Sequence, residues 1–270
     1  MNLKYMGSKS RIAKYIVPII QNYINENGIK KYVEPFVGGA NIIDKVQCEE
    51  KYGFDKNKYL IALLKRVQSG EELYEEVPKD LYDKARTAFN NGNTSEFEDW
   101  KIGNIGFIAS FNGRWFDGGY AKTGYEKTKN GMRLRNYYQE AKNNILTQAS
   151  DLKGIVFGVS DYKESIELPY DSGMLIYCDP PYQGTKQYAN AMTFDYNEFW
   201  QTMRDWSKNN IVLISEQNAP DDFECIWEQE VSRSIKAADK SKSTEKLFKW
   251  NGGVIQKEMD HRLIFPETSY

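Results

Sequence analysis

The sequence predicts an α/β protein in which a mostly parallel sheet with a late antiparallel strand carries a mainly helical insertion. Short apolar runs typical of buried strands alternate with amphipathic stretches at helical spacing, which is the pattern of a parallel sheet. Between about residues 70 and 150 this alternation stops, and helical segments follow one another around an aromatic, Gly-rich loop. We therefore expect one domain from residues 1–69 and 151–270 and an inserted domain from residues 70–150.

The first half of the expected sheet begins after an amphipathic helix. Isoleucines and tyrosines recur at helical spacing over residues 12–24. The stretch KKYVEPFVGGANIID, residues 30–44, reads as a short buried strand, a Gly-rich turn and a helix. The stretch EKYGFDKNKYLIALLKRV, residues 50–67, repeats this pattern, with a strand that closes on Asp55 and a helix after it.

Helical character marks the expected insertion, and the sheet pattern returns beyond it. The insertion's helical stretches are residues 79–90, 96–110 and 134–149. The later elements of the sheet are a strand at 154–160, a strand at 173–179, a helix at 196–208 and a strand at 210–216. The segments FECIWEQEV, residues 223–231, and HRLIF, residues 261–265, are expected to form the late antiparallel pair.

Composition excludes several classes of protein. A chain of 270 residues with 40% hydrophobic content can bury a sizeable core, and no apolar run approaches the roughly 20 residues that span a bilayer. The amino-terminal MNLKYMGSK lacks the apolar stretch of a signal peptide, and the three cysteines form no CxxC pair, so we expect a cytoplasmic protein with reduced thiols. His261 is the only histidine, which leaves little for a zinc site or a histidine-based triad. We expect no metal.

The net charge of −2 gives no overall signature of nucleic-acid binding, but two stretches are locally basic. Residues 118–144 contain six Lys and Arg against two acids, and residues 231–249 have the same balance. Both stretches are rich in small polar residues and read as basic loops. Contact with phosphates and a merely solvated face explain them equally well.

The turn VEPFVGGAN, residues 33–41, follows an expected strand, and its glycines would let a ligand approach the backbone closely. It is neither GxGxxG nor a phosphate-gripping GKS or GKT loop, which favours a nucleoside ligand without a pyrophosphate. Asp55 ends the next strand, where an acid commonly receives ribose hydroxyls. Tight packing of strand against helix is the alternative reading of this turn.

The stretch YCDPPYQGT, residues 177–185, places an acid, two prolines and a tyrosine at the end of a buried strand. The exocyclic amine of a nucleobase is a poor nucleophile because its lone pair is delocalised into the ring. Asp179 and the carbonyl of Pro180 could each accept one N–H of such an amine and direct its lone pair at a sulfonium methyl group. Pro180 and Pro181 would hold this geometry, and Tyr182 would offer a flat face for the base. A loop stiffened by proline is the structural alternative.

These motifs together resemble the N6-adenine DNA methyltransferases of the Dam type, the D12 class, as carried by many phages. The resemblance covers nearly the whole chain in the family's order, with KYMGSK, VEPFVGGA, GFDKN, GVSDYKE and CDPPY as its motifs. It implies a Rossmann-like S-adenosylmethionine-dependent methyltransferase fold with Asp179, Pro180, Pro181 and Tyr182 as the catalytic motif. The residues it implies for cofactor binding are Tyr5, Lys9, Phe36, Gly38, Gly39, Asp55, Asp161, Tyr162 and Asp179. Ala40 replaces the last glycine of the family's FxGxG motif, which concerns the tightness of that turn.

The family places its target-recognition domain between the Gly turn and DPPY, where this chain has its insertion. The stretch IASFNGRWFDGGYAKTG, residues 108–124, resembles the family's FNG-containing DNA-contact loop. The residues expected to contact DNA are Asn112, Arg114, Trp115, Phe116, Lys122 and Arg133. Trp115 and Phe116 would serve as wedges or stacking surfaces, with a buried aromatic cluster as the alternative.

The resemblance implies an enzyme that moves the methyl group of S-adenosyl-L-methionine to N6 of an adenine flipped out of double-stranded DNA, leaving S-adenosylhomocysteine. It places the protein in the cytoplasm of a bacterium or a phage-infected host, with no membrane and no obligate protein partner. N4 of cytosine offers a similar amine, and related motifs also serve on RNA bases and protein glutamine, so these substrates remain alternatives. A DNA-binding module that has lost turnover is the alternative of another class.

Overall fold

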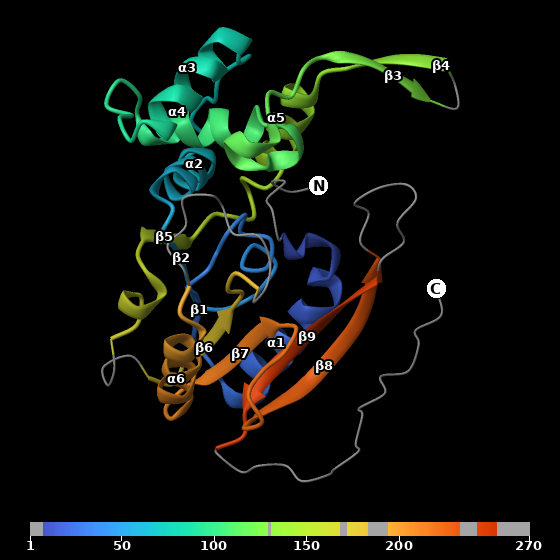
Figure 1. Cartoon of the computed structure of the whole chain (residues 1–270). Coiled ribbons are helices and arrows are strands. Elements are labelled where there is room, and N and C mark those ends of the chain that lie inside the picture. The colour runs from blue at the N-terminus through green and yellow to red at the C-terminus, as the bar shows by residue number, and fades with distance from the viewer. Residues whose placement is uncertain (1–7, 129–130, 168–171, 183–193, 233–241, 253–270) are drawn as a thin grey trace.

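A seven-stranded sheet forms the centre of the molecule, with a helical layer beyond one end of it (Figure 1). The computed structural model describes residues 8–128, 131–167, 172–182, 194–232 and 242–252. None of the helices within these ranges is long and apolar enough to cross a membrane.

Five parallel strands and an antiparallel hairpin make up the sheet, in the order β5-β2-β1-β6-β7-β9-β8. The parallel strands are β1 (Lys31–Glu34), β2 (Glu50–Asp55), β5 (Ile155–Val159), β6 (Leu175–Cys178) and β7 (Ile211–Glu216). The antiparallel pair is β8 (Phe223–Ser232) and β9 (Lys242–Trp250), with β9 next to β7. Strand order reverses between β1 and β6, the point at which doubly wound sheets bind ligands beyond the carboxyl ends of the strands. The expected Rossmann-like sheet with a late antiparallel strand is confirmed.

Helices cover both faces of the sheet, and the side chains of β6 show why. Leu175 and Tyr177 point into the buried cluster that also contains α1 (Ala13–Asn27) and α2 (Lys58–Gln68). Ile176 and Cys178 point the other way, into the cluster lined by α6 (Tyr196–Ser207). All four residues are at most 2% exposed, so the strand is a continuous apolar run, as expected of a central parallel strand.

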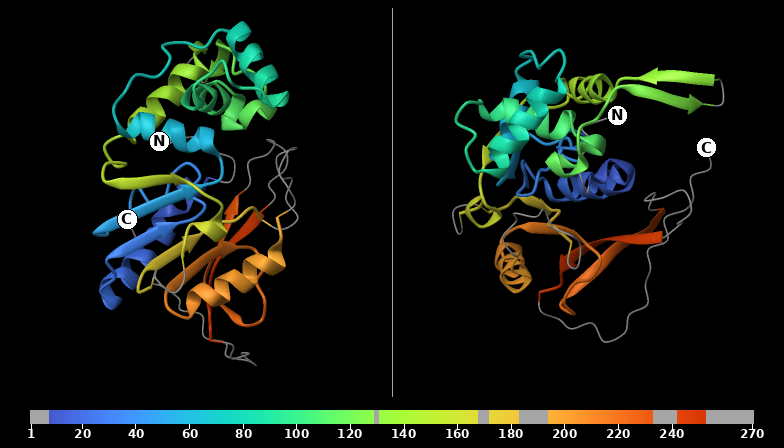
Figure 2. Two further views of the ribbon diagram at one scale, coloured as in Figure 1. Left: turned by 90° about the vertical axis from the view of Figure 1, so that its left-hand side faces the viewer. Right: turned by 45° about the horizontal axis from the view of Figure 1, so that its top comes forward.

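The helical layer is built from α3 (Lys79–Asn90), α4 (Asp99–Gly103), a π-helical turn (Asn104–Ile108) and α5 (Tyr137–Leu146). Both views in Figure 2 place it beyond the same end of the sheet, and α2 connects the two. Gly103 permits this contact, because a Cβ there would stand 2.2 Å from the carbonyl oxygen of Tyr59 on α2. One buried apolar cluster runs from α1 through α2 into the helical layer.

Three expected elements differ in the structure. Residues 41–45 form hydrogen-bonded turns where a helix was predicted after the Gly turn. The helix predicted at 96–110 is shorter in the structure: it begins at Asp99 with α4, continues into the π-helical turn and ends at Ile108. A projecting hairpin of β3 (Gly124–Thr128) and β4 (Gly131–Arg135) occupies a region predicted as loop and helix, and α5 begins after it (Figure 1).

The partner that the structure describes for β8 is a strand that the sequence did not predict. It pairs with β9, which runs from Lys242 to Trp250, whereas the partner expected from the sequence was residues 261–265. Those residues, and His261 among them, lie outside the described part of the chain. The stretch 231–249, predicted as a basic loop, therefore contributes a strand of the sheet. Its Leu247 and Phe248 are buried, and this short apolar pair directs β9 against β7.

Candidate active site

The residues Asp179 to Tyr182 leave the carboxyl end of β6, beside the ends of β1 and β7. Pro180 is buried and Pro181 is exposed. The hydroxyl of Tyr196, at the start of α6, donates to the carbonyl oxygen of Pro181 at 2.7 Å. Because each proline fixes its own φ angle, the segment has little conformational freedom between a buried strand and this hydrogen bond.

Lys9 connects the amino-terminal segment to this motif. It lies in a short 3₁₀ helix (Lys9–Arg11) and its side chain is only 8% exposed. Its Nζ is 2.9 Å from Oδ1 of Asp179 and 4.3 Å from the centre of the Tyr182 ring. The ammonium thus pairs with the acid and lies over one face of the tyrosine.

The carboxyl of Asp179 has an unusual proton affinity. Burial raises its pKa to about 6, although the Lys9 ammonium acts in the opposite direction. The carboxylates of Glu245 and Glu216 make smaller contributions that raise this pKa, and the value of about 6 is the net result. Burial next to Asp179 and Glu245 also raises the pKa of Tyr182, so that its phenol stays protonated at neutral pH. At pH 7 the site therefore presents a carboxylate acceptor beside a neutral aromatic ring.

The Gly turn after β1 has two residues in the left-handed region of backbone conformation. Gly38 has φ of 49° and Ala40 has φ of 54°, both in the left-handed region. Ala40 stands where the FxGxG motif has its last glycine, and it adopts the left-handed conformation that glycine tolerates best. For alanine this conformation costs roughly 1–2 kcal/mol. The N–H of Gly38 donates to Oδ2 of Asp55 at 3.2 Å, and Oδ1 of Asp55 accepts from the N–H of Asn57 at 2.9 Å. Asp55 therefore holds the turn against the start of α2.

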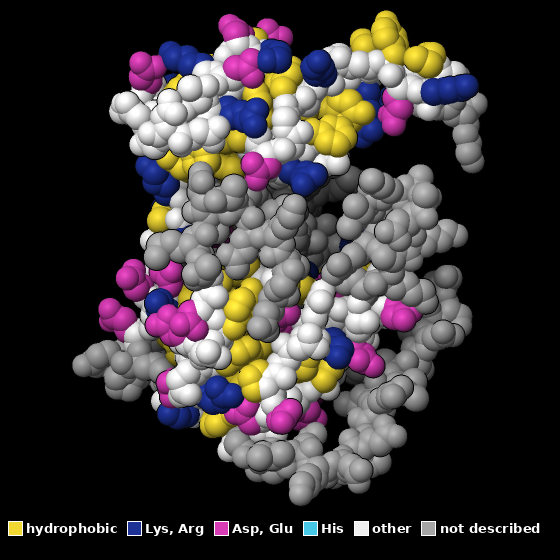
Figure 3. All heavy atoms as spheres, viewed as in Figure 1, with side chains coloured by type: hydrophobic (Ala, Val, Ile, Leu, Met, Phe, Trp, Pro, Cys, Tyr) yellow, Lys and Arg dark blue, Asp and Glu magenta, His cyan; other side chains and the backbone are white. Residues whose placement is uncertain are grey.

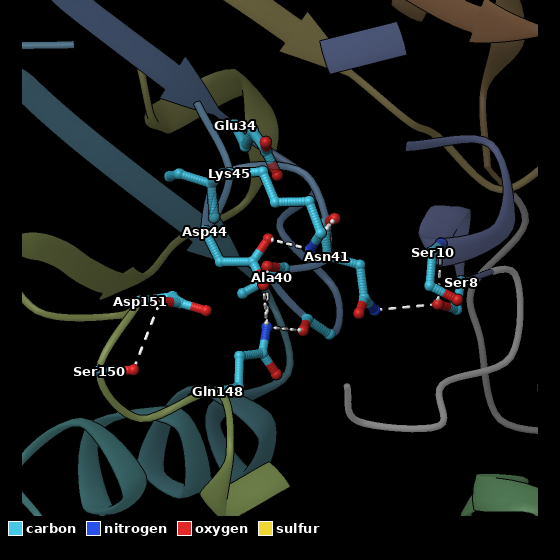
Figure 4. Close-up of polar contacts among 12 residues, drawn as sticks. Ser8, Ser10, Glu34, Ala40, Asn41, Asp44, Lys45, Gln148, Ser150 and Asp151 are labelled. Carbon is cyan, nitrogen blue, oxygen red and sulfur yellow. Dashed lines mark hydrogen bonds and ion pairs between the residues drawn. The ribbon is translucent and has the colours of Figure 1, made fainter. Parts of the chain in front are cut away.

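A polar network ties the end of the helical layer to the same turn (Figure 4). Gln148 is 1% exposed, and its Nε2 donates to the carbonyl oxygens of Gly39 (3.2 Å) and Ala40 (3.0 Å) and to Oδ2 of Asp44 (3.0 Å). Lys45 pairs with the other carboxylate oxygen of Asp44 at 2.7 Å. The segment that follows α5 therefore contributes directly to the shape of the Gly turn.

Asn41 supplies a buried acceptor beside this turn. Its Nδ2 donates to Oγ of Ser8 at 2.9 Å, and the residue is 5% exposed. Among the described residues its Oδ1 has no hydrogen-bond partner. Because buried acceptors are rarely left unsatisfied, we expect this atom to accept from a bound molecule or from a residue outside the described ranges.

Phe36, Asp161 and Tyr162 come together at the carboxyl ends of β1 and β5. The rings of Phe36 and Tyr162 stack at 5.2 Å between centroids, and Phe199 of α6 packs against both. Burial raises the pKa of Tyr162 to about 12. Oδ1 of Asp161 accepts from the N–H of Lys163 and thereby caps the short helix that carries Tyr162. Tyr5 lies outside the described residues.

The residues expected to contact DNA divide into two groups. Trp115 and Phe116 are 6% and 2% exposed and pack against Phe89, which corresponds to the alternative of a buried aromatic cluster. Trp115 also has a left-handed φ of 43°, and its ring fills the space above Gly106. The other four side chains are exposed: Asn112, Arg114, Lys122 and Arg133.

Four features of the site were not identified from the sequence: Glu245, Gln148, Asn41 and the β3–β4 hairpin. Oε2 of Glu245 accepts from the hydroxyl of Tyr182 at 2.6 Å, across a separation of 63 residues. Gln148 reaches Gly39 over a separation of 109 residues. No local sequence pattern signals contacts between side chains so far apart. Asn41 directly follows the VGGA turn, so its position gave a usable signal.

Comparison with known proteins gives three findings. The model of the family "D12 class N6 adenine-specific DNA methyltransferase" matches residues 5–212. The type II methyltransferase M.MjaIII of Methanocaldococcus jannaschii is 27% identical, with 73% of this chain and 74% of that protein covered. The type II methyltransferase M.FokI of Planomicrobium okeanokoites is 22% identical, and the match covers 76% of this chain but only 31% of that protein.

Among solved structures, a proposed methyltransferase from Thermoplasma acidophilum is similar at 11% identity. The TM-score is 0.24, with 48% of this chain and 56% of that chain covered. This similarity is too low to carry an argument, and the fold rests on the strand order described above.

Proposed function

This chain belongs to the D12 class of N6 adenine-specific DNA methyltransferases, and we propose that it takes the methyl group from S-adenosyl-L-methionine and acts on an adenine flipped out of double-stranded DNA. The family assignment covers the enzyme class and adenine methylation of DNA. The donor, the flipped state of the base and the roles of individual residues are the content of the proposal.

The observation that carries the proposal is the placement of Asp179 and Tyr182 around Lys9. Asp179 offers a carboxylate acceptor, and the Tyr182 ring lies 4.3 Å from the same ammonium group. A base amine donates N–H groups as an ammonium does, and a base ring stacks on an aromatic face. The geometry therefore supports recognition of a heterocyclic amine. Asp179 and the Pro180 carbonyl would each accept one N–H and orient the nitrogen lone pair.

The Gly turn fits a nucleoside cofactor with an amino-acid end. Asp55 stands at the end of β2 with each carboxylate oxygen accepting one backbone N–H, and each oxygen has a second lone pair for a ribose hydroxyl. The buried Oδ1 of Asn41 suits the ammonium of a methionine group. Phe36 and Tyr162 offer an aromatic surface for the adenine of the cofactor. When bound, S-adenosyl-L-methionine supplies a positively charged sulfonium methyl group as the electrophile.

We assign target recognition to residues 70–150, because the exposed hairpin there suits a nucleic-acid surface. Tyr125, Met132 and Leu134 are 72%, 65% and 57% exposed. The register pairs Tyr125 with Leu134, so these apolar side chains share one face of the hairpin, and Arg133 lies on the other. Figure 3 shows hydrophobic side chains gathered on the projecting hairpin, with basic side chains close by. Such a projection is suited to enter a groove, where apolar side chains separate base steps and cations contact phosphates.

The test is methyl transfer from labelled S-adenosyl-L-methionine to unmethylated double-stranded DNA, followed by mass spectrometry of the digested nucleosides. We expect N6-methyladenine. N4-methylcytosine would retain the mechanism and overturn the proposed base. Cofactor binding without label in DNA would overturn the proposal and favour an RNA or protein substrate or an inactive binding module.

A further inference from the structure

Three segments that are distant in the sequence meet at the carboxyl end of β6. The Tyr182 hydroxyl donates to Oε2 of Glu245 at 2.6 Å, and Nζ of Lys9 lies 3.7 Å from the same oxygen. Glu245 is 16% exposed and belongs to β9, which the sequence gives no reason to associate with the DPPY motif. Its carboxylate thus contacts the ring that the proposed function uses to stack the base.

We propose that Glu245 is a positioning residue, which fixes the plane of the Tyr182 ring by accepting a hydrogen bond from its hydroxyl. The inference rests on the proposed function, because the ring plane matters only if a base stacks there. Glu245 itself would not touch the base or the cofactor. It acts at the hydroxyl end of the ring, away from the ring faces.

The backbone of β9 makes Glu245 a firm anchor. Lys246, Leu247 and Phe248 pair with the last three residues of β7, so Glu245 is the first residue of β9 beyond that ladder. Its backbone continues to pair with Gln229 of β8. The side chain therefore projects from a fixed strand just where β7 ends, beside the end of β6.

The charges of the site suit this role. A phenol kept protonated by its surroundings can only donate to a neighbouring carboxylate, and a hydrogen bond to an ionised acceptor is stronger than a neutral one. This bond opposes rotation of the ring about the bond that joins it to Cβ. Lys9 lies over one face of the ring, so a base that stacks on Tyr182 in this arrangement uses the opposite face. Holding the ring plane then holds the base at a fixed distance from Asp179.

A double-mutant cycle with Glu245→Ala and Tyr182→Phe tests the inference, with methyl transfer to duplex DNA and cofactor affinity measured separately. We expect Glu245→Ala to lower kcat about 10- to 100-fold, in the range that loss of orientation produces, with the cofactor Kd changed less than twofold. Glu245→Gln retains an acceptor oxygen and should recover most of the loss, which also guards against a folding defect in the alanine variant. Glu228→Gln, an exposed acid on the neighbouring strand β8, is the matched control and should have no effect.

If Glu245 acts through the Tyr182 hydroxyl, the double variant will be no slower than Tyr182→Phe alone. Losses that multiply would overturn the inference, as would an unchanged kcat in Glu245→Ala. A second readout does not depend on catalysis: 3-fluorotyrosine placed at position 182 should shift its fluorine resonance in Glu245→Ala but not in Glu228→Gln. An unshifted resonance would show that the contact is absent and would also overturn the inference. If the unaltered enzyme methylates no DNA, the proposed function fails, whereas an active enzyme insensitive to Glu245 refutes only the positioning role.

Discussion

Lys9 and Asp179 form an ion pair of 2.9 Å in which the lysine is 8% and the acid 19% exposed. Removing one partner of such a buried ion pair destabilises the protein, because the charge of the other partner is left uncompensated. Here the pair joins the segment before α1 to the end of β6, so the amino-terminal motif and the DPPY motif meet at one carboxylate. The protonation of that carboxylate then governs the chemistry proposed for the site.

The rate should fall on the acid side of pH 6. Because burial raises the pKa of Asp179 to about 6, the carboxylate that accepts the amine N–H prevails above this pH and the protonated acid below it. We expect kcat/KM to decrease about tenfold per pH unit below pH 6, since this parameter reports the free enzyme. Near-UV circular dichroism over the same range serves as the control for folding. A profile that stays flat down to pH 5 would contradict the assignment.

Replacing Lys9 by Met should move this acid limb to higher pH. The Lys9 ammonium lowers the pKa of Asp179, whereas burial, Glu245 and Glu216 raise it. Without the ammonium the carboxyl holds its proton at higher pH, and less of the enzyme is active at neutrality. Lys14→Met, on the exposed side of α1, is the matched control. The prediction concerns the midpoint of the pH profile, and an unshifted midpoint in Lys9→Met would refute it.

Asp179→Ala should abolish most activity while cofactor binding largely persists. The substitution removes the acceptor proposed for the amine, and loss of one such group typically costs 10²- to 10³-fold in rate. Asp179→Asn should be milder but still severe, because an amide keeps one acceptor oxygen. Single-turnover methylation and equilibrium cofactor binding, measured on the same preparations, separate the two effects. Near-normal turnover in Asp179→Ala would rule out the catalytic role.

Much of the fold was predictable because buried faces leave a periodic record in the sequence. The helix α3 was predicted with both ends correct and α6 within one residue, because their apolar residues recur on one face. The β3–β4 hairpin left no such record: its Tyr125, Met132 and Leu134 are exposed, so no buried alternation marks the strands. The strand β9 was missed because, among its residues 244–250, only Leu247 and Phe248 are buried.

The site shows the same division. Asp179, Asp55 and the Gly turn follow strands directly, so the sequence places them at one edge of the sheet. Glu245 and Gln148 reach the site only through tertiary folding. Glu245 comes from the β8–β9 pair, and Gln148 comes from the end of the helical layer. A side chain whose role depends on a partner so distant in the sequence carries no local signature.

Gln148→Leu should destabilise the protein and weaken cofactor binding together. The substitution keeps an apolar stem but leaves two buried carbonyl oxygens and one oxygen of Asp44 without this donor (Figure 4). We expect a loss of about 1–3 kcal/mol in the free energy of unfolding, the range for buried acceptors left unsatisfied. Gln139→Leu, which removes an exposed hydrogen bond on α5, is the control. Denaturant titration and cofactor titration measure the two effects. Unchanged cofactor affinity would show that the contact of Gln148 with the Gly turn does not affect cofactor binding.

Arg133→Ala should weaken DNA binding without affecting stability. The Arg133 side chain is 68% exposed, and its ion pair with Glu140 is long, at 3.7 Å. Arg135 is paired more closely, at 2.8 Å with Glu140 and at 3.1 Å with Glu126. Arg133 is therefore the more available cation on the hairpin. If it contacts one phosphate, the slope of log K against log salt should fall by about 0.9, with little dependence on DNA sequence.

Lys208→Ala, which removes an exposed cation on the opposite side of the molecule at the end of α6, is the control for Arg133→Ala and should leave the slope unchanged (Figure 1). Fluorescence anisotropy at several salt concentrations gives both slopes. The unfolding free energy of Arg133→Ala should stay within about 0.5 kcal/mol of the unaltered protein, as is usual for surface substitutions. Equal slopes in the two variants would place the DNA backbone elsewhere, because a cation that neutralises a phosphate must release a counterion and so change the salt dependence.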